Sequence, residues 1–216
     1  MGGIIREGII RLKHGVKKDL KDIDILFDDL SVIADIFGLM KGFSGISYNR
    51  FGNILWTPEE GVLIEIVPFS QKMNFPQKMT FEPTIQNIIS TCDITSSAFG
   101  YSSKRKEIYS CGGIEAIDSK TLDLLKAESN PSIVMTRIIL QHHKLNFSIG
   151  PNATRYIQEH YTDSCDEEIY RYLEYKDNLS MYNTVCKSLR KLSRNSTIGC
   201  LLPSQTYLSP EVSFGN

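Results

Sequence analysis

The chain has 216 residues, of which 41% are hydrophobic and 23% are charged. This composition excludes a disordered or collagen-like chain, and the length corresponds to one large domain or two small ones, since domains usually contain about 100–200 residues. The net charge of −1 argues against a surface that binds polyanions over its whole extent.

The first half of the chain is predicted to mix helices and strands. Apolar residues at helical spacing predict a helix over residues 4–12, and the same spacing returns over residues 30–40. Between them, Asp22–Phe27 alternates and then becomes apolar, which is typical of a strand with one buried face. Two further strands, at residues 45–56 and 61–69, are separated by a turn and are expected to form a hairpin.

The second half is predicted to be helical. A loop with two prolines covers residues 71–83, and short elements follow it at residues 85–94, 97–101 and 107–109. From Ser119 onward the pattern changes to successive helices. Pro131 fits the first turn of one helix, and Asp166–Tyr175 and residues 181–192 are amphipathic. The tail from Ser204 is expected to fray.

Asp22 and Asp24 form the first candidate site. Residues at i and i+2 of a strand project from the same face of a sheet, so the two carboxylates would lie together. Close carboxylates repel each other, and a divalent cation relieves that repulsion. The alternative is a solvent-exposed acidic strand edge, which is the commoner setting of an isolated Asp-x-Asp.

Two other features point to the same chemistry. Gly2-Gly3 leads directly into a helix, whose free N–H groups and positive dipole end suit a phosphate, although a plain turn is the alternative. Glu65 interrupts an apolar strand, where a carboxylate requires a metal ion or a salt bridge to a lysine. A phosphate cradle, paired carboxylates and a third acid are together what two-metal nucleotidyl transfer requires.

The order of these motifs resembles a known pattern. Gly2-Gly3-Ile4-Ile5-Arg6-Glu7 is similar to Gly-Gly-x-x-Arg-Asp, and Lys21-Asp22-Ile23-Asp24 is similar to Lys-Asp-x-Asp, in the head domain of CCA-adding tRNA nucleotidyltransferases and bacterial poly(A) polymerases. Later motifs of that family are matched in order by residues 50–54, 64–69, 93–99, 112–115 and 144–147. The resemblance covers nearly the whole chain.

The resemblance implies an α+β fold, in which a nucleotidyltransferase-type mixed β-sheet head with flanking helices precedes an all-helical neck and partial body. It places the head at residues 1–125, the neck and the start of the body at residues 126–203, and a flexible tail at residues 204–216. It implies metal-dependent transfer of a nucleoside monophosphate from an NTP to an RNA 3′ end, such as that of tRNA.

The family's functional residues have counterparts in this sequence. The resemblance implies that Asp22 and Asp24 bind two Mg²⁺ ions and that Glu65 completes the catalytic set and helps to deprotonate the hydroxyl. The nucleotide-binding residues that it implies are Gly2, Gly3, Arg6, Asp93 and Arg137.

Several arginines of the family are missing from this chain. The arginine pair before Asp93 is Thr91-Cys92, and the arginine after the third-acid strand is Ser70. The Glu-Asp-x-x-Arg element that templates the incoming base is replaced by residues 129–133, Ser-Asn-Pro-Ser-Ile. Neither Ser nor Cys replaces the planar five-donor fork of an arginine, so strict selection of CTP or ATP is not expected.

Two alternatives remain open at this point. One keeps the fold and the chemistry but transfers the nucleotide to a protein or a small molecule. The other is a non-catalytic remnant that binds RNA, a nucleotide or a partner protein, which the missing arginines favour. Retention of three acids opposes it, because clustered carboxylates without a metal ion are destabilising.

The remaining features have plainer interpretations. Five cysteines, widely spaced and without a CxxC pair, favour a reducing, cytoplasmic setting over a zinc site or a disulfide framework. No apolar run approaches the about 20 residues that cross a bilayer, and no leader peptide is recognised, so we expect neither a membrane partner nor secretion. Basic clusters are interpreted as solvated faces, and they comprise Lys17, Lys18 and Lys21, then Lys104, Arg105 and Lys106, then Lys187, Arg190, Lys191 and Arg194.

Overall fold

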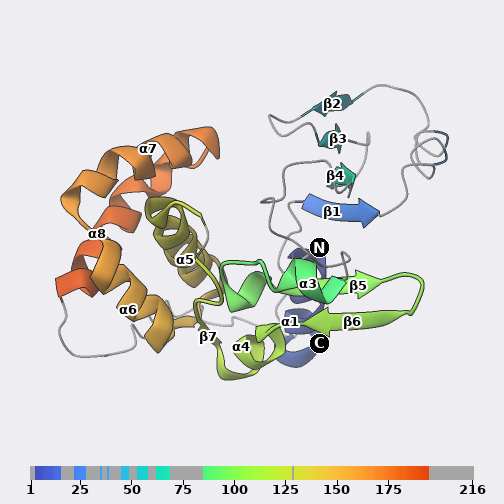
Figure 1. Cartoon of the computed structure of the whole chain (residues 1–216), viewed down its shortest axis with the longest axis horizontal. Helices are drawn as coiled ribbons and strands as arrows, with labels where there is room; N and C mark the ends of the chain where they lie inside the picture. The colour runs from blue at the N-terminus through green and yellow to red at the C-terminus, as the bar shows by residue number, and fades with distance from the viewer. Residues whose placement is uncertain are drawn as a thin grey trace, which may run out of the picture. The chain divides into compact units, whose positions relative to one another are not determined.

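The chain folds as two compact units of helices and small sheets (Figure 1). The structure, a computed structural model, describes residues 3–15, 22–27, 35, 38, 45–48, 53–57, 62–68, 85–127 and 129–194. The first unit consists of residues 1–119 and 123–129, and the second of residues 120–122 and 130–216. The mixture of helices and strands confirms the predicted α+β class.

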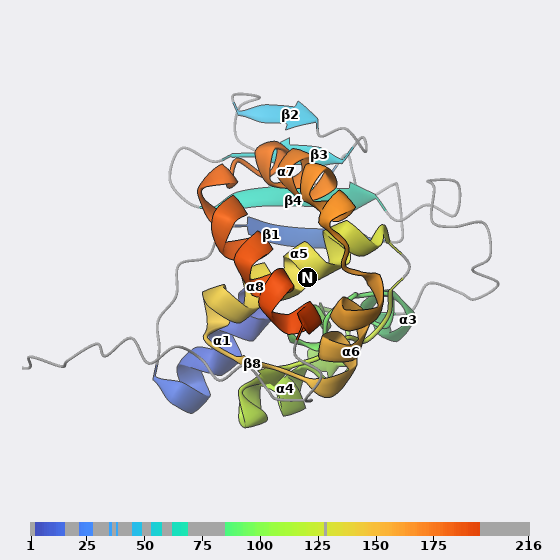
Figure 2. The same cartoon turned by 90° about the vertical axis from the view of Figure 1, so that its left-hand side faces the viewer.

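A mixed four-stranded sheet forms part of the first unit. Its strands lie in the order β1-β4-β3-β2, which can be followed in Figures 1 and 2. Strand β1 runs parallel to β4, whereas β3 is antiparallel to both β4 and β2. The strand bounds are β1 Asp22–Phe27, β2 Ile46–Tyr48, β3 Ile54–Trp56 and β4 Leu63–Pro68.

The prediction of one continuous strand over residues 45–56 is wrong. The segment forms β2 and β3, which pair with each other, so that Ile46 lies opposite Trp56. Alternation of side chains has the same period on both sides of a chain reversal, so the pattern alone did not indicate the turn. The expected antiparallel pairing with the next strand is confirmed, since β3 pairs with β4.

One face of this sheet is apolar. Ile54 and Ile66 are register partners on β3 and β4, and both are buried. Ile46, Trp56 and Ile64 pack against them on the same face. Because side chains alternate along a strand, the residues between these positions lie on the opposite face of the sheet.

Helices and a hairpin complete the first unit. Helix α1 extends over the whole predicted segment and ends at His14. Gly15 follows it, and its φ of 68° and its N–H bond to the Arg11 carbonyl are typical of a left-handed helix cap. Lys13 forms an ion pair with Asp118 of α4. The element bounds are α1 Gly3–His14, α3 Ile85–Ile89, η1 Thr95–Ser97, β5 Phe99–Ser102, β6 Glu107–Ser110 and α4 Gly113–Ser119.

The Gly112-Gly113 motif begins helix α4. The Ser110 hydroxyl accepts the backbone N–H groups of Gly113 and Ile114 at 2.9 and 3.1 Å, so it satisfies two donors of the first turn. A Cβ on Gly113 would lie 2.5 Å from the ring of Phe99. Glycine therefore allows this helix start to pack directly against a fully buried aromatic ring.

The second unit is a small helical bundle. Its helices are packed around Ile138, Ile139, Ile157, Ile169 and Leu189, all of which are fully buried. Helix α7 has the bounds predicted from the sequence. The element bounds are β7 Thr121–Leu122, α5 Pro131–Leu145, β8 Ser148–Ile149, α6 Pro151–His160, η2 Asp163–Cys165, α7 Asp166–Tyr175, η3 Leu179–Met181 and α8 Tyr182–Arg194.

Strands β7 and β8 depart from the successive helices predicted from Ser119 onward. They form a parallel pair of two residues each, too short to produce a periodic pattern in the sequence. Predicted elements at residues 30–40, the loop at residues 71–83 and the tail from residue 204 lie largely or wholly outside the described residues. None of the helices described is both long and apolar enough to cross a bilayer.

Candidate functional site

Asp24 and Glu65 are neighbours across the two parallel strands of the sheet. Asp24 of β1 is the register partner of Glu65 of β4. Register partners project from the same face, and adjacent strands are about 4.8 Å apart. Both residues are half-buried. The structure thus brings two of the three predicted acids together on one face of the sheet.

The strand geometry also gives the face of the sheet to which position 22, the third predicted acid, belongs. Position 22 lies two residues before Asp24 in β1, so it belongs to the same face. The side chain of Asp22 lies outside the described residues. Alternation explains the arrangement, because Ile64 and Ile66 on either side of Glu65 belong to the apolar face.

Asn53 holds the Glu65 carboxylate. Its side-chain amide donates a hydrogen bond of 2.7 Å to Glu65 Oε1. Asn53 stands two residues before Leu55, which is the register partner of Glu65, so the amide lies on the acidic face. Sequence reasoning gave Asn53 no role, since its position depends on the register of two strands.

The donor set on this face fits a hard divalent cation. Mg²⁺ prefers carboxylate oxygens, and two neighbouring carboxylates repel each other until a cation compensates them. Among the described side chains, which do not include that of Asp22, no group of three or more His, Cys, Asp and Glu is arranged to hold a metal ion. Asp24 and Glu65 supply two of the three carboxylates that the predicted site requires.

Arg6, a predicted triphosphate ligand, is buried in the first unit. Only 4% of it is exposed, and its guanidinium contacts Glu7 Oε1 through Nη2 at 2.9 Å and Nε at 3.2 Å. Nη1 donates to the backbone carbonyl of Ser96 at 3.3 Å. In this arrangement Arg6 links α1 to the Asp93–Phe99 segment, and direct contact with a triphosphate stays a prediction.

The other predicted nucleotide-binding residues are divided between the units. Gly3 begins α1, and Gly2 lies outside the described residues. Asp93 is buried in the first unit, where its carbonyl accepts the N–H of Leu125 at 2.8 Å. Arg137 belongs to α5 of the second unit. Nucleotide binding by these four residues stays a prediction.

The segment that replaces the base-templating element caps a helix. The Asn130 side chain accepts the backbone N–H of Ser132 at 2.8 Å, and its amide donates to Glu168 Oε1 at 3.2 Å. Pro131 occupies the first turn of α5, as the sequence predicted. The Asn130 side chain therefore stabilises the start of α5.

A second polar cluster lies in the helical bundle, and its side chains pair with one another. Arg190 forms ion pairs with Asp163, at 3.5 Å, and with Asp166. The Tyr161 hydroxyl donates to Asp166 at 3.0 Å, and burial together with that carboxylate raises the pKa of Tyr161. The cluster borders a pocket of about 150 Å³. Both carboxylates are paired with Arg190 within the bundle itself, so the arrangement indicates a structural role.

Comparisons with known proteins place the fold. Neither a protein-family model nor a curated protein matches the sequence. Among solved structures, the chain is similar to a CCA-adding enzyme with CTP, at 16% identity and a TM-score of 0.58, and to one with ATP, at 15% and 0.59. Both alignments cover 88% of this chain and 46% of the other.

A third structure is consistent with these two. The chain is similar to the Thermotoga maritima CCA-adding enzyme complexed with tRNA, at 17% identity and a TM-score of 0.51, over 84% of this chain and 46% of that one. The chain thus spans about half the length of the structures that it matches. The similarity establishes that the chain has a fold like that of the CCA-adding enzymes.

Proposed function

We propose that the chain is a nucleotidyltransferase that transfers a nucleoside monophosphate from an NTP to the 3′ hydroxyl of an RNA. The observation that supports it most is the register pairing of Asp24 with Glu65 on one face of the sheet. The likeness to CCA-adding enzymes solved with CTP, ATP and tRNA supports NTP and RNA as partners.

The residues of the acidic face have distinct roles in this proposal. Asp22 and Asp24 would hold Mg²⁺, which when bound neutralises the charge of the phosphates, and Glu65 would complete the site. Asn53 orients Glu65 through its amide. The 3′ oxygen attacks the α-phosphorus and the bond to pyrophosphate breaks, while Glu65 accepts the proton of the hydroxyl.

A non-catalytic protein that binds RNA or a nucleotide is the second candidate. Arg6 is already bonded to Glu7 and to the Ser96 carbonyl, and Asn130 caps a helix. Arg6, which the resemblance assigns to the triphosphate, is thus engaged with the protein itself, and so is Asn130 of the segment that replaces the base-templating element. This candidate predicts ligand binding without product.

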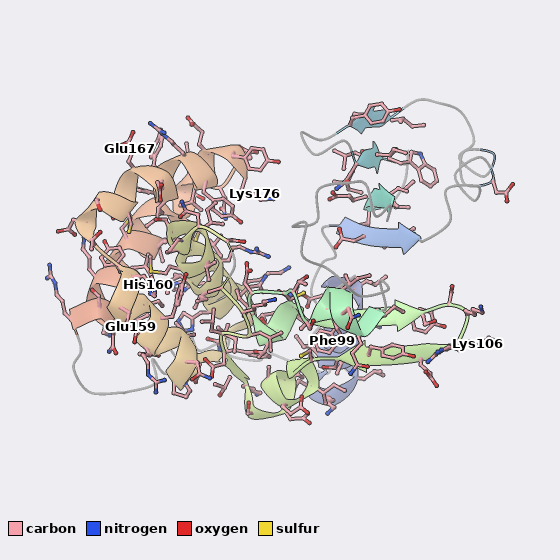
Figure 3. All side chains as sticks on the ribbon, in the orientation of Figure 1. Phe99, Lys106, Glu159, His160, Glu167 and Lys176 are labelled. Atoms are coloured by element: carbon pink, nitrogen blue, oxygen red, sulfur yellow. The ribbon has the colours of Figure 1, made fainter. Side chains whose placement is uncertain are left out.

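Asp24→Ala tests the proposal, with Glu159→Ala as the control. Glu159 is an exposed carboxylate of α6 in the second unit (Figure 3). Each protein is incubated with Mg²⁺, labelled NTPs and total RNA, and its melting temperature is measured with and without Mg²⁺ and ATP. A ligand that binds only the folded state raises the melting temperature.

We expect Asp24→Ala to abolish labelling of RNA and to lose most of the Mg²⁺-dependent shift. Without the metal ion its stability should be unchanged or raised, because one of the mutually repelling acids is removed. Glu159→Ala should behave as the wild type in every measurement. Equal shifts for Asp24→Ala and the wild type would refute the metal site, and a wild type that binds but labels nothing would favour the second candidate.

A further inference from the structure

The outer half of the β5–β6 hairpin exposes an apolar pair. Tyr101 and Ile108 are register partners on these antiparallel strands, so their side chains project from the same face. Each is 53% exposed. Phe99, two residues before Tyr101 on that face, is fully buried at the base of the hairpin (Figure 3). The face is therefore covered at its base and open to solvent toward its tip.

The opposite face of the hairpin is fixed against α3. A Cβ on Gly100 would lie 2.5 Å from Ile85 Cγ2 and 3.2 Å from Ile89 Cγ2, so the backbone touches this helix directly. Gly100 alternates with Tyr101 and therefore belongs to the opposite face. Packing on α3 thus directs the Tyr101 face away from that helix.

The tip of the hairpin is basic. Lys104, Arg105 and Lys106 are consecutive exposed residues, and Lys106 lies at the outer end of the hairpin in Figure 3. Arg105 donates to the Tyr109 hydroxyl at 3.3 Å, and that hydroxyl donates to Glu107 at 2.8 Å. Lys104 and Lys106 form no ion pair within the part of the chain that the structure describes. Their two ammonium groups are available to an external anion.

We propose that this hairpin surface, formed by Tyr101, Lys104, Lys106 and Ile108, binds single-stranded RNA. The ammonium groups would contact phosphates, and the exposed Tyr101 ring would stack on a base beside Ile108. Cations beside an open aromatic ring are the combination that binds single strands without sequence preference, whereas cations alone attract any polyanion. The choice of RNA over DNA rests on the proposed function.

The test is fluorescence anisotropy with a labelled single-stranded RNA of twelve nucleotides and the full chain. EDTA is present and NTP is absent, so the measurement is independent of transfer. The variants are Tyr101→Ala, Tyr101→Phe and Lys104→Ala/Lys106→Ala. The control, Lys187→Ala/Lys191→Ala, removes the same charge from exposed positions of α8. Thermal melting confirms that each variant is folded.

We expect Tyr101→Ala to weaken binding by about fivefold or more, and Tyr101→Phe, which keeps the ring, by less than about twofold. Removal of both tip lysines should lower the slope of log affinity against log salt by roughly 1.4, since each phosphate contact on a single strand contributes about 0.7. The control pair should leave affinity and slope close to those of the wild type.

Three results would overturn the hairpin surface. These are equal affinities of Tyr101→Ala and the wild type, an equal loss for the control pair, and binding of phosphatidylserine vesicles but not RNA through the same residues. The outcome is separable from that of the proposed transferase. If RNA binds through the hairpin but is not extended, only the proposal of nucleotidyl transfer is overturned. If Tyr101→Ala extends RNA as well as the wild type does, only the proposal of RNA binding by the hairpin is overturned.

Discussion

The side-chain amide of Asn53 donates a 2.7 Å hydrogen bond to Oε1 of Glu65. The amide stands just before β3 and the acid lies within β4, so the pairing of these two strands orients the carboxylate. A candidate catalytic acid is thus positioned by its own sheet.

Asn53→Ala and Asn53→Asp should affect the acidic face differently. Loss of a half-buried hydrogen bond to a charged acceptor should lower the free energy of unfolding by about 1 kcal/mol in Asn53→Ala. Asn53→Asp adds a carboxylate next to Glu65. Its decrease in the free energy of unfolding should therefore be larger than that of Asn53→Ala in EDTA, and this decrease should become smaller when Mg²⁺ is added. Urea denaturation with and without Mg²⁺ measures both. A deficit in Asn53→Asp that Mg²⁺ leaves unchanged would contradict the cation site.

Arg6→Met should destabilise the first unit strongly. It leaves the Glu7 carboxylate, which is 6% exposed, without the guanidinium that now neutralises it. Breaking a buried ion pair in this way costs about 3–5 kcal/mol, whereas an apolar replacement of both partners is often tolerated. Chemical denaturation should therefore show Arg6→Met/Glu7→Leu to be more stable than Arg6→Met. The reverse order would show that Arg6 and Glu7 do not form a coupled pair.

Nucleotide selectivity should be loose. Asn130 is used as the N-cap of α5, and a missing hydrogen-bonding partner removes the main source of discrimination between bases. Binding constants for the four NTPs should differ by only a few-fold. Asn130→Ala should cost about 1 kcal/mol of stability through loss of the cap and leave these ratios unchanged. A hundredfold preference for one base would show that another part of the chain reads it.

Cys186 should be the slowest of the described cysteines to react with iodoacetamide. It is 2% exposed, and burial and then the Asp166 carboxylate raise the pKa of its thiol. The thiolate is the reactive form, so a raised pKa and restricted access both slow alkylation. Mass spectrometry after timed alkylation at pH 8 should find Cys111, which is half-buried, modified first of the two. Equal rates would contradict the buried position of Cys186.

Local patterns predicted the elements whose apolar side chains follow a regular spacing. The alternation around Ile23 and Ile25 gave β1 its observed bounds, and the amphipathic pattern of Asp166–Tyr175 gave those of α7. Pro131 likewise indicated the start of α5, because proline has no N–H to donate and is favoured in the first turn of a helix. Helix α6 was not predicted as a separate element, although Gly150-Pro151 has the composition of a helix start.

Features that depend on distant parts of the chain were not predictable in the same way. The sequence places Asp24 and Glu65 on strands, but only the parallel pairing of β1 with β4 makes them neighbours. The contact of Arg6 with the Ser96 carbonyl likewise joins segments far apart in the sequence. Periodicity contains no information about such register. The family resemblance assigns Arg6 to the triphosphate, and that contact stays a prediction for a residue that is buried in the structure.

The pairing of β7 with β8 has a consequence for the construction of fragments. Residues 120–122 belong to the helical unit, although residues 123–129, which follow them, return to the first unit. The carbonyls of Lys120 and Leu122 accept the N–H groups of Ser148 and Gly150, each at 2.7 Å. A helical fragment that begins after residue 122 would leave both donors without these acceptors. No single cut of the chain therefore separates the two units intact. A fragment that reproduces the first unit would have to include residues 123–129 but not residues 120–122.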